Sequence, residues 1–368
     1  MRSPFDAFEE ELNRDDHDDP DGVERSSWAA VDLGDALAGV DVPGPSMLAR
    51  TDDVRLVYRG RTHQFAGESE SCKTWAALLC VKQTLDEGGT VLWIDFEDDD
   101  RGIVARLLSL GVDRSAIAEQ FVYVRPDEPL HDRSGRATAG NVAFGAVLAS
   151  RAFDLAVVDG VTEAMTTEGL DLMSNADIAT WSRRVPKRIV DATGAGVIVI
   201  DHVTKSTEGR GRFAIGGQHK LSGLTGAAYV FDVTKRLSRS TNGEESTGSV
   251  RISVAKDRPG HVRGNARGDV IGVLELVAYP DGGLTAKIVP AGESSTVPDI
   301  HLLSKIGNFL SVYDGASKNK IIGEVEGKTD SVRNAVQWMV DNLWLSVTKS
   351  GQSHRHHLTD LGRKELGL

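Results

Sequence analysis

The chain of 368 residues has 54 acidic and 42 basic side chains, a formal net charge of −12. That balance argues against a uniformly basic nucleic-acid coat, so any nucleic-acid site must be local. The two cysteines favour a reducing cytoplasm over a disulfide framework, and no apolar run approaches the length of a membrane span. We expect a cytoplasmic protein without membrane contact.

The N-terminal region is expected to lie outside the folded core. Residues 1–27 are strongly acidic and predict a disordered tail, with no resemblance to a signal peptide. Residues 28–47 hold a short apolar pattern, strongest over Trp28–Leu37, which predicts a docking helix.

Residues 48–290 alternate short apolar runs with helical patterns, which predicts an α/β domain with a largely parallel sheet. Its buried strands are expected at 55–58, 90–95, 121–124, 154–159 and 196–201. After residue 228 the helical patterns stop, and we expect an antiparallel extension. Its strands are expected at 230–233, 249–255, 270–277 and 284–289, with turns at Asn242 and Asp281.

A phosphate-binding loop is predicted at Gly67–Thr74, Gly-Glu-Ser-Glu-Ser-Cys-Lys-Thr, between an apolar run and a helix-like segment. This spacing lets backbone N–H groups wrap a triphosphate, with Lys73 on its β- and γ-oxygens and Thr74 in a Mg²⁺ shell. The expected ATP contacts are Gly67, Glu68, Ser69, Glu70, Ser71, Cys72, Lys73, Thr74 and Trp75. Cys72 stands where the pattern prefers glycine, so its side chain is expected to strain the loop or crowd the phosphates. The alternative is a chance loop before a buried helix.

Three strand-end residues supply the remaining chemistry of a triphosphate hydrolase. Asp159 ends an apolar strand, where a Walker B carboxylate would hold Mg²⁺. Glu97 follows a strand that we expect beside the phosphate-loop strand, and it could polarise the attacking water. His202 ends another strand and could hydrogen-bond the γ-phosphate, or could be structural. We expect Asp99 and its neighbour Asp100 to be solvated.

Residues 203–222 are rich in glycine and cations and directly follow His202. Cations there would bind the phosphates of single-stranded DNA without reading sequence. The expected contacts are Lys205, Arg210, Arg212 and Lys220. A mobile surface loop is the alternative.

Residues 291–298 have the composition of a linker, and residues 299–368 predict a small α+β winged-helix domain. Its third helix, 330–343, would enter the major groove of duplex DNA, with Lys328 and Arg333 at its leading end. A protein–protein module is the alternative, since winged helices also pair proteins.

From about residue 48 to 289, the chain resembles the RecA-like hexameric ATPases, above all the RepA-type plasmid helicases. Within that superfamily it resembles AAA family ATPases of actinobacterial or phage type. The resemblance is carried by the phosphate loop, Phe96-Glu97-Asp98-Asp99, the Asp159 strand and residues 200–205. It implies a RecA-like P-loop NTPase core in which Glu97 is the catalytic base and His202 couples the γ-phosphate to DNA loops.

The resemblance also extends to Lys256 and Arg258, which are similar to the Lys-x-Arg segment of replicative helicases. It implies that both cations reach a neighbouring subunit's site, so that the protein acts as a homo-oligomer, expected to be a hexamer. The sequence departs from the family pattern in three respects. Cys72 replaces a glycine, no helicase N-terminal or primase module is visible, and the expected winged helix is C-terminal to the core.

The expected function is an ATP- and Mg²⁺-dependent ATPase that acts on DNA in replication or recombination, with helicase activity as one form of it. An alternative is an ATP-gated DNA-binding regulator with slow hydrolysis. A KaiC-like or signalling ATPase without nucleic acid is a third hypothesis.

Overall fold

The computed structural model describes residues 30–39, 42–202, 223–238, 244–292, 298, 300–350 and 353–368. The chain divides into two compact units, 1–42 and 43–368. In the first unit, the described part forms the short helix α2 (Gly34–Leu37), and the side chains of Val31, Leu33 and Leu37 are exposed. The docking helix predicted over Trp28–Leu37 lies partly outside the described residues.

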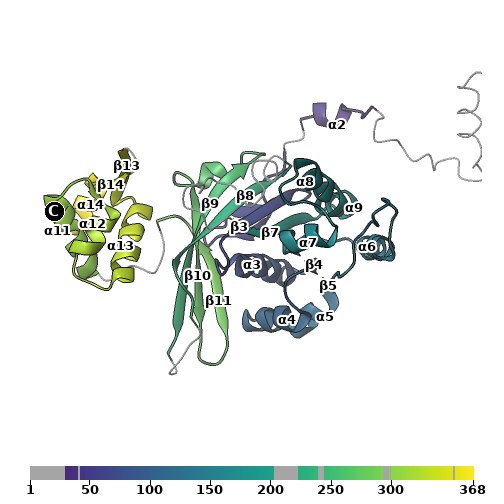
Figure 1. Ribbon diagram of the computed structural model, residues 1–368, viewed down its shortest axis with the longest axis horizontal. Helices are drawn as coiled ribbons and strands as arrows, with labels where there is room; N and C mark the ends of the chain where they lie inside the picture. The colour runs from purple at the N-terminus through teal and green to yellow at the C-terminus, as the bar shows by residue number, and fades with distance from the viewer. Residues whose placement is uncertain are drawn as a thin grey trace, which may run out of the picture. The chain divides into compact units, whose positions relative to one another are not determined.

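The second unit is built on a nine-stranded sheet with the order β11-β10-β9-β8-β3-β7-β6-β4-β5 (Figure 1). The strands are β3 (Thr62–Gly67), β4 (Val91–Asp95), β5 (Phe121–Val124), β6 (Leu155–Asp159), β7 (Gly196–His202), β8 (Ala227–Lys235), β9 (Ser246–Asp257), β10 (Val270–Ala278) and β11 (Leu284–Val289). Strands from β8 to β5 pair in parallel, and β8 to β11 pair antiparallel. The predicted fold class, a mostly parallel sheet with an antiparallel extension as in RecA-like P-loop proteins, is confirmed.

Three details of the predicted sheet are wrong. Strand β2 (Arg55–Val57) pairs antiparallel with β1 (Met47–Ala49) in a separate two-stranded sheet. Strand β8 was expected to be an antiparallel addition, but it pairs in parallel with β3. Strand β4 does not lie beside β3, because β7 and β6 separate them. An apolar run indicates that a strand is buried, but it does not name the strand's partner.

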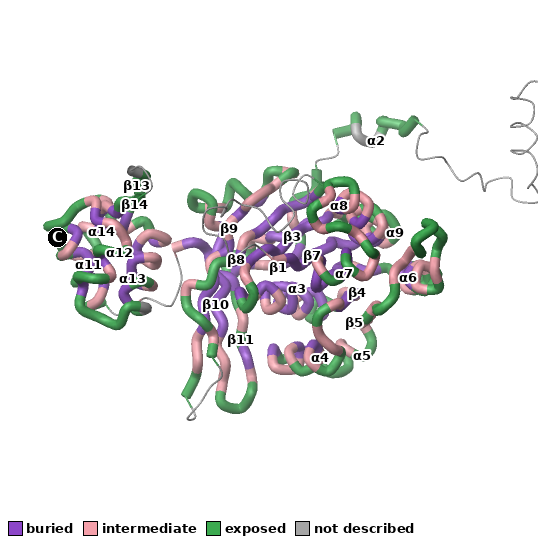
Figure 2. The backbone as a smooth tube through the Cα atoms, in the orientation of Figure 1, coloured by how far each residue is buried: buried purple, intermediate pink, exposed green. Residues whose placement is uncertain are grey.

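Helices cover both faces of the parallel strands (Figure 1). One face packs on α3 (Lys73–Asp86), α4 (Asp100–Ser109) and α5 (Arg114–Gln120). The other packs on α6 (Ala139–Ser150), α7 (Val161–Thr167), α8 (Asn175–Ser182) and α9 (Arg188–Thr193). Because side chains alternate along a strand, Val91 and Trp93 of β4 join the first core while Leu92 and Ile94 join the second. The inner parallel strands β3, β4, β6 and β7 are therefore buried on both faces, whereas the edge strand β5 is half-buried (Figure 2).

Two short helical turns interrupt the regular pattern. The π-helical segment η1 (Arg183–Lys187) joins α8 to α9 and contains Pro186, whose ring nitrogen has no proton to donate to a regular ladder. The 3₁₀ turn η2 (Arg263–Asn265) lies between β9 and β10. The predicted turn at Asp281 is present, with Gly282 at φ +88°, whereas Asn242 lies outside the described residues.

The C-terminal region has its own apolar core. Its elements are α11 (Ile300–Val312), β12 (Ala316–Ser317), α12 (Lys318–Glu324), α13 (Thr329–Asp341), β13 (Leu345–Ser350), β14 (Ser353–Leu358) and α14 (Asp360–Leu366). The three strands form an antiparallel sheet in the order β12-β14-β13. The domain boundaries proposed from the sequence stay predictions. In the described parts of the chain, no helix is long and apolar enough to cross a bilayer.

Candidate nucleotide-binding site

The predicted phosphate loop connects the carboxyl end of β3 to the start of α3. A Cβ added to Gly67 would lie 2.5 Å from Ser71 Oγ and 2.7 Å from the Phe231 carbonyl oxygen. Only glycine therefore fits where the loop leaves the sheet. The Ser71 side chain is buried beneath the loop.

Cys72 has a left-handed backbone, with φ +62° and ψ 22°, immediately before α3. For a residue with a Cβ, this conformation costs roughly 1–2 kcal/mol. Glycine escapes that cost, which gives a backbone reason for the glycine of the sequence pattern. Position 72 thus carries the strain that its side chain was expected to cause.

Lys73 is 5 % exposed and folds back over the loop. Its Nζ donates to the carbonyl oxygens of Gly67 at 2.9 Å and Glu68 at 2.7 Å, and to Ser71 Oγ at 3.3 Å. Burial lowers the pKa of Lys73, and the carboxylates of Asp159 and Glu97 oppose that shift. The ammonium group of Lys73 therefore lies against the backbone of the phosphate loop.

Asp159 ends β6 next to the first turn of α3, where Thr74 Oγ1 lies 3.4 Å from its Oδ2. Its Oδ1 is buried and has no hydrogen-bond partner within the described parts of the chain. Burial first, and then the charges of Glu97 and Asp95, raise the pKa of Asp159 to about 7.

These donors fit a Mg²⁺ ion. An unsatisfied buried carboxylate oxygen is costly, and a hard cation beside the Thr74 hydroxyl would satisfy it. The described residues contain no cluster of three or more His, Cys, Asp or Glu side chains suited to a metal. The ion would therefore take its remaining ligands from water and phosphate, as Mg²⁺ commonly does.

Glu97 and His202 meet although their strands, β4 and β7, are separated by β6. His202 Nε2 lies 3.1 Å from Glu97 Oε1. This hydrogen bond is the main cause of the lowered pKa of Glu97 and of the raised pKa of His202. The carboxylate of Glu97 is thus kept ionised, as a base requires.

Asp95, the last residue of β4, holds the turn that carries Glu97. It is fully buried, and its Oδ1 accepts from the backbone N–H groups of Glu97 at 2.9 Å and Asp98 at 2.8 Å. Its Oδ2 accepts from Trp93 Nε1 at 3.3 Å and the Tyr123 hydroxyl at 3.2 Å. An aspartate at the strand end, two residues before Glu97, was the available sign of such a turn.

Other acidic neighbours also have structural roles. Asp99, which we expected to be a solvated charge, caps α4 by accepting from the Gly102 N–H at 2.7 Å. Asp98 pairs with Arg106 of α4 at 2.7 Å. The acidic run after β4 therefore fixes the start of α4 as well as the turn.

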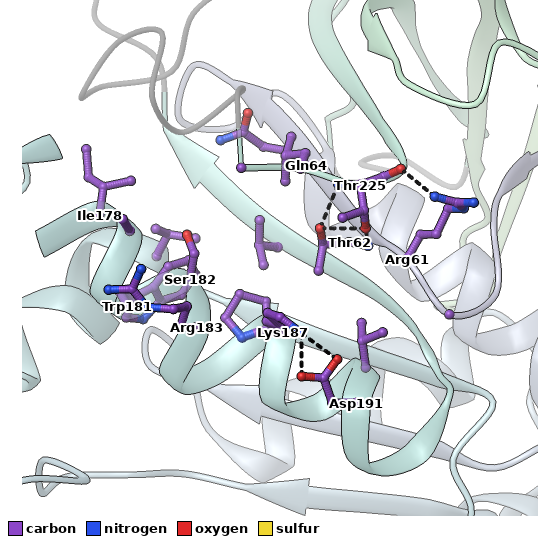
Figure 3. A pocket seen from close by; sticks show the side chains of 18 of the residues that line it. Arg61, Thr62, Gln64, Ile178, Trp181, Ser182, Arg183, Lys187, Asp191 and Thr225 are labelled. Atoms are coloured by element: carbon purple, nitrogen blue, oxygen red, sulfur yellow. Dashed lines mark hydrogen bonds and ion pairs between the residues drawn. The ribbon is translucent and has the colours of Figure 1, made fainter. Parts of the chain in front are cut away.

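These groups line one cavity of about 440 Å³. Its walls are Ser69, Glu70, Ser71, Cys72, Lys73, Thr74, Trp75, Glu97, Arg106, Asp159, Ile200, His202, Val233, Arg236 and Leu237. A larger cavity, about 590 Å³, lies between the start of β3 and α8–α9. Figure 3 shows it, with Lys187 paired to Asp191 and Thr62 bonded to Thr225. The residues that the sequence predicted to contact phosphate, metal and the attacking water line the smaller cavity, which makes it the candidate nucleotide site.

Lys256 and Arg258 do not line the smaller cavity. Lys256 Nζ donates to the Leu224 carbonyl oxygen at 3.0 Å, and Arg258 is exposed. Along β8, Phe231 pairs with Gly67 at the phosphate-loop end of β3, whereas Ala228 pairs with Lys256. Both cations therefore lie toward the opposite end of the sheet from their own phosphate loop.

The predicted nucleic-acid contacts are only partly within the described residues. Lys328 and Arg333 are exposed at the start of α13. Lys205, Arg210, Arg212 and Lys220 lie outside the described residues.

Comparison with known proteins agrees with this geometry. Residues 49–208, which include the phosphate loop, Glu97, Asp159 and His202, match the model of a family described as an AAA domain. The fold and this match support a RecA-like P-loop ATPase. Among solved structures, the chain is similar to a KaiC-like protein from the hyperthermophilic archaeon Pyrococcus horikoshii OT3, with a TM-score of 0.46 and 12 % identity. That alignment covers 68 % of this chain and 100 % of the archaeal one. A comparison with curated proteins found no match.

Proposed function

We propose that this chain binds ATP with Mg²⁺ and hydrolyses it as an oligomeric, DNA-dependent ATPase similar to RepA-type helicases, in the replication or recombination of DNA. The observation that carries the ATPase assignment is the convergence of five groups on one cavity. They are Lys73, Thr74, Glu97, Asp159 and His202.

Each group has a role that its position supports. Lys73 exchanges its loop carbonyl partners for phosphate oxygens, while Thr74 and Asp159 hold Mg²⁺. When bound, Mg²⁺ neutralises charge that develops on the phosphates. Glu97, ionised and fixed at its backbone by Asp95, accepts the proton of the attacking water. His202 can pair with Glu97 or with a γ-phosphate, which links the base to the nucleotide state.

Two observations support an oligomer that acts on DNA. Lys256 and Arg258 are remote from their own cavity, so a role in phosphoryl transfer requires that of another copy. The proposed winged helix spans α11 to α14, and Lys328 and Arg333 are exposed at the start of α13, the helix proposed to enter the DNA groove. The basic segment 203–222 supplies the proposed single-stranded DNA contacts.

The test is ATP hydrolysis by the full chain with and without single-stranded DNA. We expect DNA to stimulate turnover, and Lys73→Ala or Glu97→Gln to abolish it. Lys82→Ala is the matched control for Lys73, because Lys82 lies on the same helix and pairs with Asp86 at the surface. Turnover that ignores DNA would refute the DNA-dependent part, and turnover that survives both active-site changes would refute the site.

The left-handed Cys72 favours one second candidate, an ATP-gated DNA-binding regulator with slow hydrolysis. A strained loop can bind nucleotide yet hold it imperfectly for the in-line reaction. Tight ATP binding with negligible turnover, together with ATP-dependent binding of the full chain to duplex DNA, would favour this candidate over the motor.

A further inference from the structure

The loop that carries Arg258 is held to the sheet at its beginning. Residues 258–269 connect β9 to β10. The backbone N–H of Arg258 donates to the Gly226 carbonyl oxygen at 3.1 Å. Pro259 follows, which disfavours a helical backbone at Arg258. Val262 is fully buried in the apolar core, so the loop is fixed on both sides of Pro259.

Asp257, the last residue of β9, uses both of its carboxylate oxygens to close this turn. Its Oδ1 accepts from the Tyr58 hydroxyl at 2.8 Å and from the Gly260 N–H at 3.1 Å. Its Oδ2 accepts from the N–H groups of Val262 and Arg263, each at 2.9 Å. Hydrogen bonds to an ionised carboxylate are stronger than those between neutral groups. One side chain therefore fixes the backbone at the start of the loop.

Tyr58 anchors Asp257 to the buried core. It directly follows β2, is 1 % exposed and stacks on the His63 ring, with 5.8 Å between the ring centroids. Its backbone N–H donates to His63 Nε2 at 3.0 Å. Its hydroxyl also accepts from the His261 N–H at 3.2 Å. Because Tyr58 is itself fixed, Asp257 is oriented from the core as well as from the loop.

The side chain of Arg258 differs from its backbone, because it is exposed. Within the described parts of the chain, its guanidinium group has no hydrogen-bond or ion-pair partner. A fixed backbone with an unengaged cation suits a residue that must meet charge in another subunit's site.

We propose that Asp257 is a positioning residue for Arg258, which fixes the loop so that the guanidinium group reaches a neighbouring copy's nucleotide in a productive orientation. This inference rests on the proposed function, in which Arg258 acts at the cavity of another copy. Precise placement matters because a displacement of about 1 Å can cost on the order of a hundredfold in rate.

Asp257→Asn tests this role with little change in side-chain size. The amide NH₂ replaces one acceptor oxygen and cannot accept from the loop N–H groups. We expect kcat to fall about ten- to a hundredfold, with ATP affinity unchanged because the variant's own cavity is intact. Asp281→Asn is the matched control and should keep full turnover. Asp281 also accepts from a turn N–H, that of Gly283 at 2.8 Å, but lies between β10 and β11.

Mixtures of variants separate positioning from a merely structural role. Glu97→Gln subunits carry a correctly placed Arg258, so in an equal mixture with Asp257→Asn they should restore about a quarter of the sites. A mixture of Asp257→Asn with Arg258→Ala should restore none, because neither variant supplies a correctly placed cation. If Asp257 instead supported its own cavity, neither mixture would recover.

Hydrogen exchange tests the contact without catalysis. The amides of Gly260, Val262 and Arg263 should exchange at least severalfold faster in Asp257→Asn, because they lose a carboxylate acceptor. Asp281→Asn should leave their exchange unchanged.

The outcomes distinguish this inference from the proposed function. Unchanged exchange or a normal kcat in Asp257→Asn would overturn the positioning role. So would a Glu97→Gln partner that restores Arg258→Ala but not Asp257→Asn, and in that case the proposed function would stand. Full turnover in Arg258→Ala, or no turnover in the unchanged protein, would refute the proposed function and with it the positioning role. Faster exchange in Asp257→Asn would then establish only the contact.

Discussion

At the scale of single residues, Cys72 holds a left-handed backbone conformation in the phosphate loop itself. Cys72→Gly removes the left-handed cost of a Cβ but also loosens the unfolded chain, so we expect a net stabilisation of no more than ~1 kcal/mol. Cys72→Val adds a β-branch to the same backbone and should destabilise by about 1–2 kcal/mol. Urea unfolding without nucleotide measures both. Equal stability of the two variants would show that the loop does not impose the left-handed conformation.

Asp159 predicts a pH dependence of stability. Its pKa of about 7 in the folded protein exceeds the usual value of about 4, so the folded state keeps a proton that the unfolded state has lost. Stability should therefore fall as pH rises from about 4 to about 7 and stay low above that range. Asp159→Asn should remove this loss, by up to ~4 kcal/mol at pH 8, and change little below pH 4.

The measurement is denaturant unfolding across this pH range without Mg²⁺ or nucleotide. Asp86→Asn serves as the control, since Asp86 is an exposed carboxylate paired with Lys82. Parallel pH curves for the unchanged protein and Asp159→Asn would contradict the assignment.

Site residues that belong to a loop of fixed spacing or that end an apolar strand could be predicted from the sequence. Residues whose role depends on contacts with another turn could not. Lys73 belongs to a loop of fixed spacing, and Asp159 and His202 end apolar strands, so local pattern located all three. The structure brings them into one cavity with Glu97. The role of Asp95 escaped notice because its partners depend on how the turn after β4 folds, which spacing alone does not encode.

At the scale of elements, the start of α7 brings the backbone of Gly160 close to the side chain of Glu97. Gly160→Ala should both strain the backbone and push Glu97 aside, because the added Cβ would come within 2.8 Å of Glu97 Cγ. Gly88→Ala is the matched control, since Gly88 has φ +79° and nothing within 4 Å of the added Cβ. Both variants should lose about 1 kcal/mol of stability from the left-handed backbone.

Turnover separates these two variants. Only Gly160→Ala should lose kcat, by about tenfold or more, because only there does the base move. Steady-state ATP hydrolysis at equal ATP saturation measures the difference. An equal kcat in both variants would mean that Glu97 tolerates displacement and that the close approach at Gly160 is incidental.

The sheet shows which aspects of a fold local pattern can supply. The apolar runs located the strands of the parallel core, because strands buried on both faces need them. The partner of β8 was missed, since the end of helical patterns after residue 228 suggested only hairpins. Residues 203–226 between β7 and β8 were the overlooked sign, as a parallel pair needs a crossover of a dozen residues or more.

At the scale of the whole molecule, the sheet keeps Lys256 and Arg258 away from the candidate nucleotide cavity of their own chain. The cavity lies at the carboxyl ends of β3, β6 and β7, whereas Lys256 and Arg258 lie toward the other end of β3. If both cations serve phosphoryl transfer, each must act at the cavity of another copy. The loss of either cation should therefore impair the site of a neighbouring subunit and leave the cavity of its own chain intact. Head-to-tail contacts of this kind generate rings or filaments.

Mixing two inactive variants tests this arrangement. Glu97→Gln lacks the base and Arg258→Ala lacks the donated cation, so each alone should be inactive. In mixed assemblies, an Arg258→Ala subunit that receives Arg258 from a Glu97→Gln neighbour has a complete site. Random mixing in equal amounts should restore about a quarter of the sites in a head-to-tail ring.

Mixing Glu97→Gln with Lys73→Ala is the control and should restore no sites, because both changes damage the same cavity. In that pair a complete site forms nowhere, since each subunit carries a lesion in its own base or phosphate contact. Recovery in the first mixture and none in the second requires that Arg258 acts across a subunit boundary. Failure of both mixtures to recover, with assembly intact, would place the cation's role outside the neighbour's site.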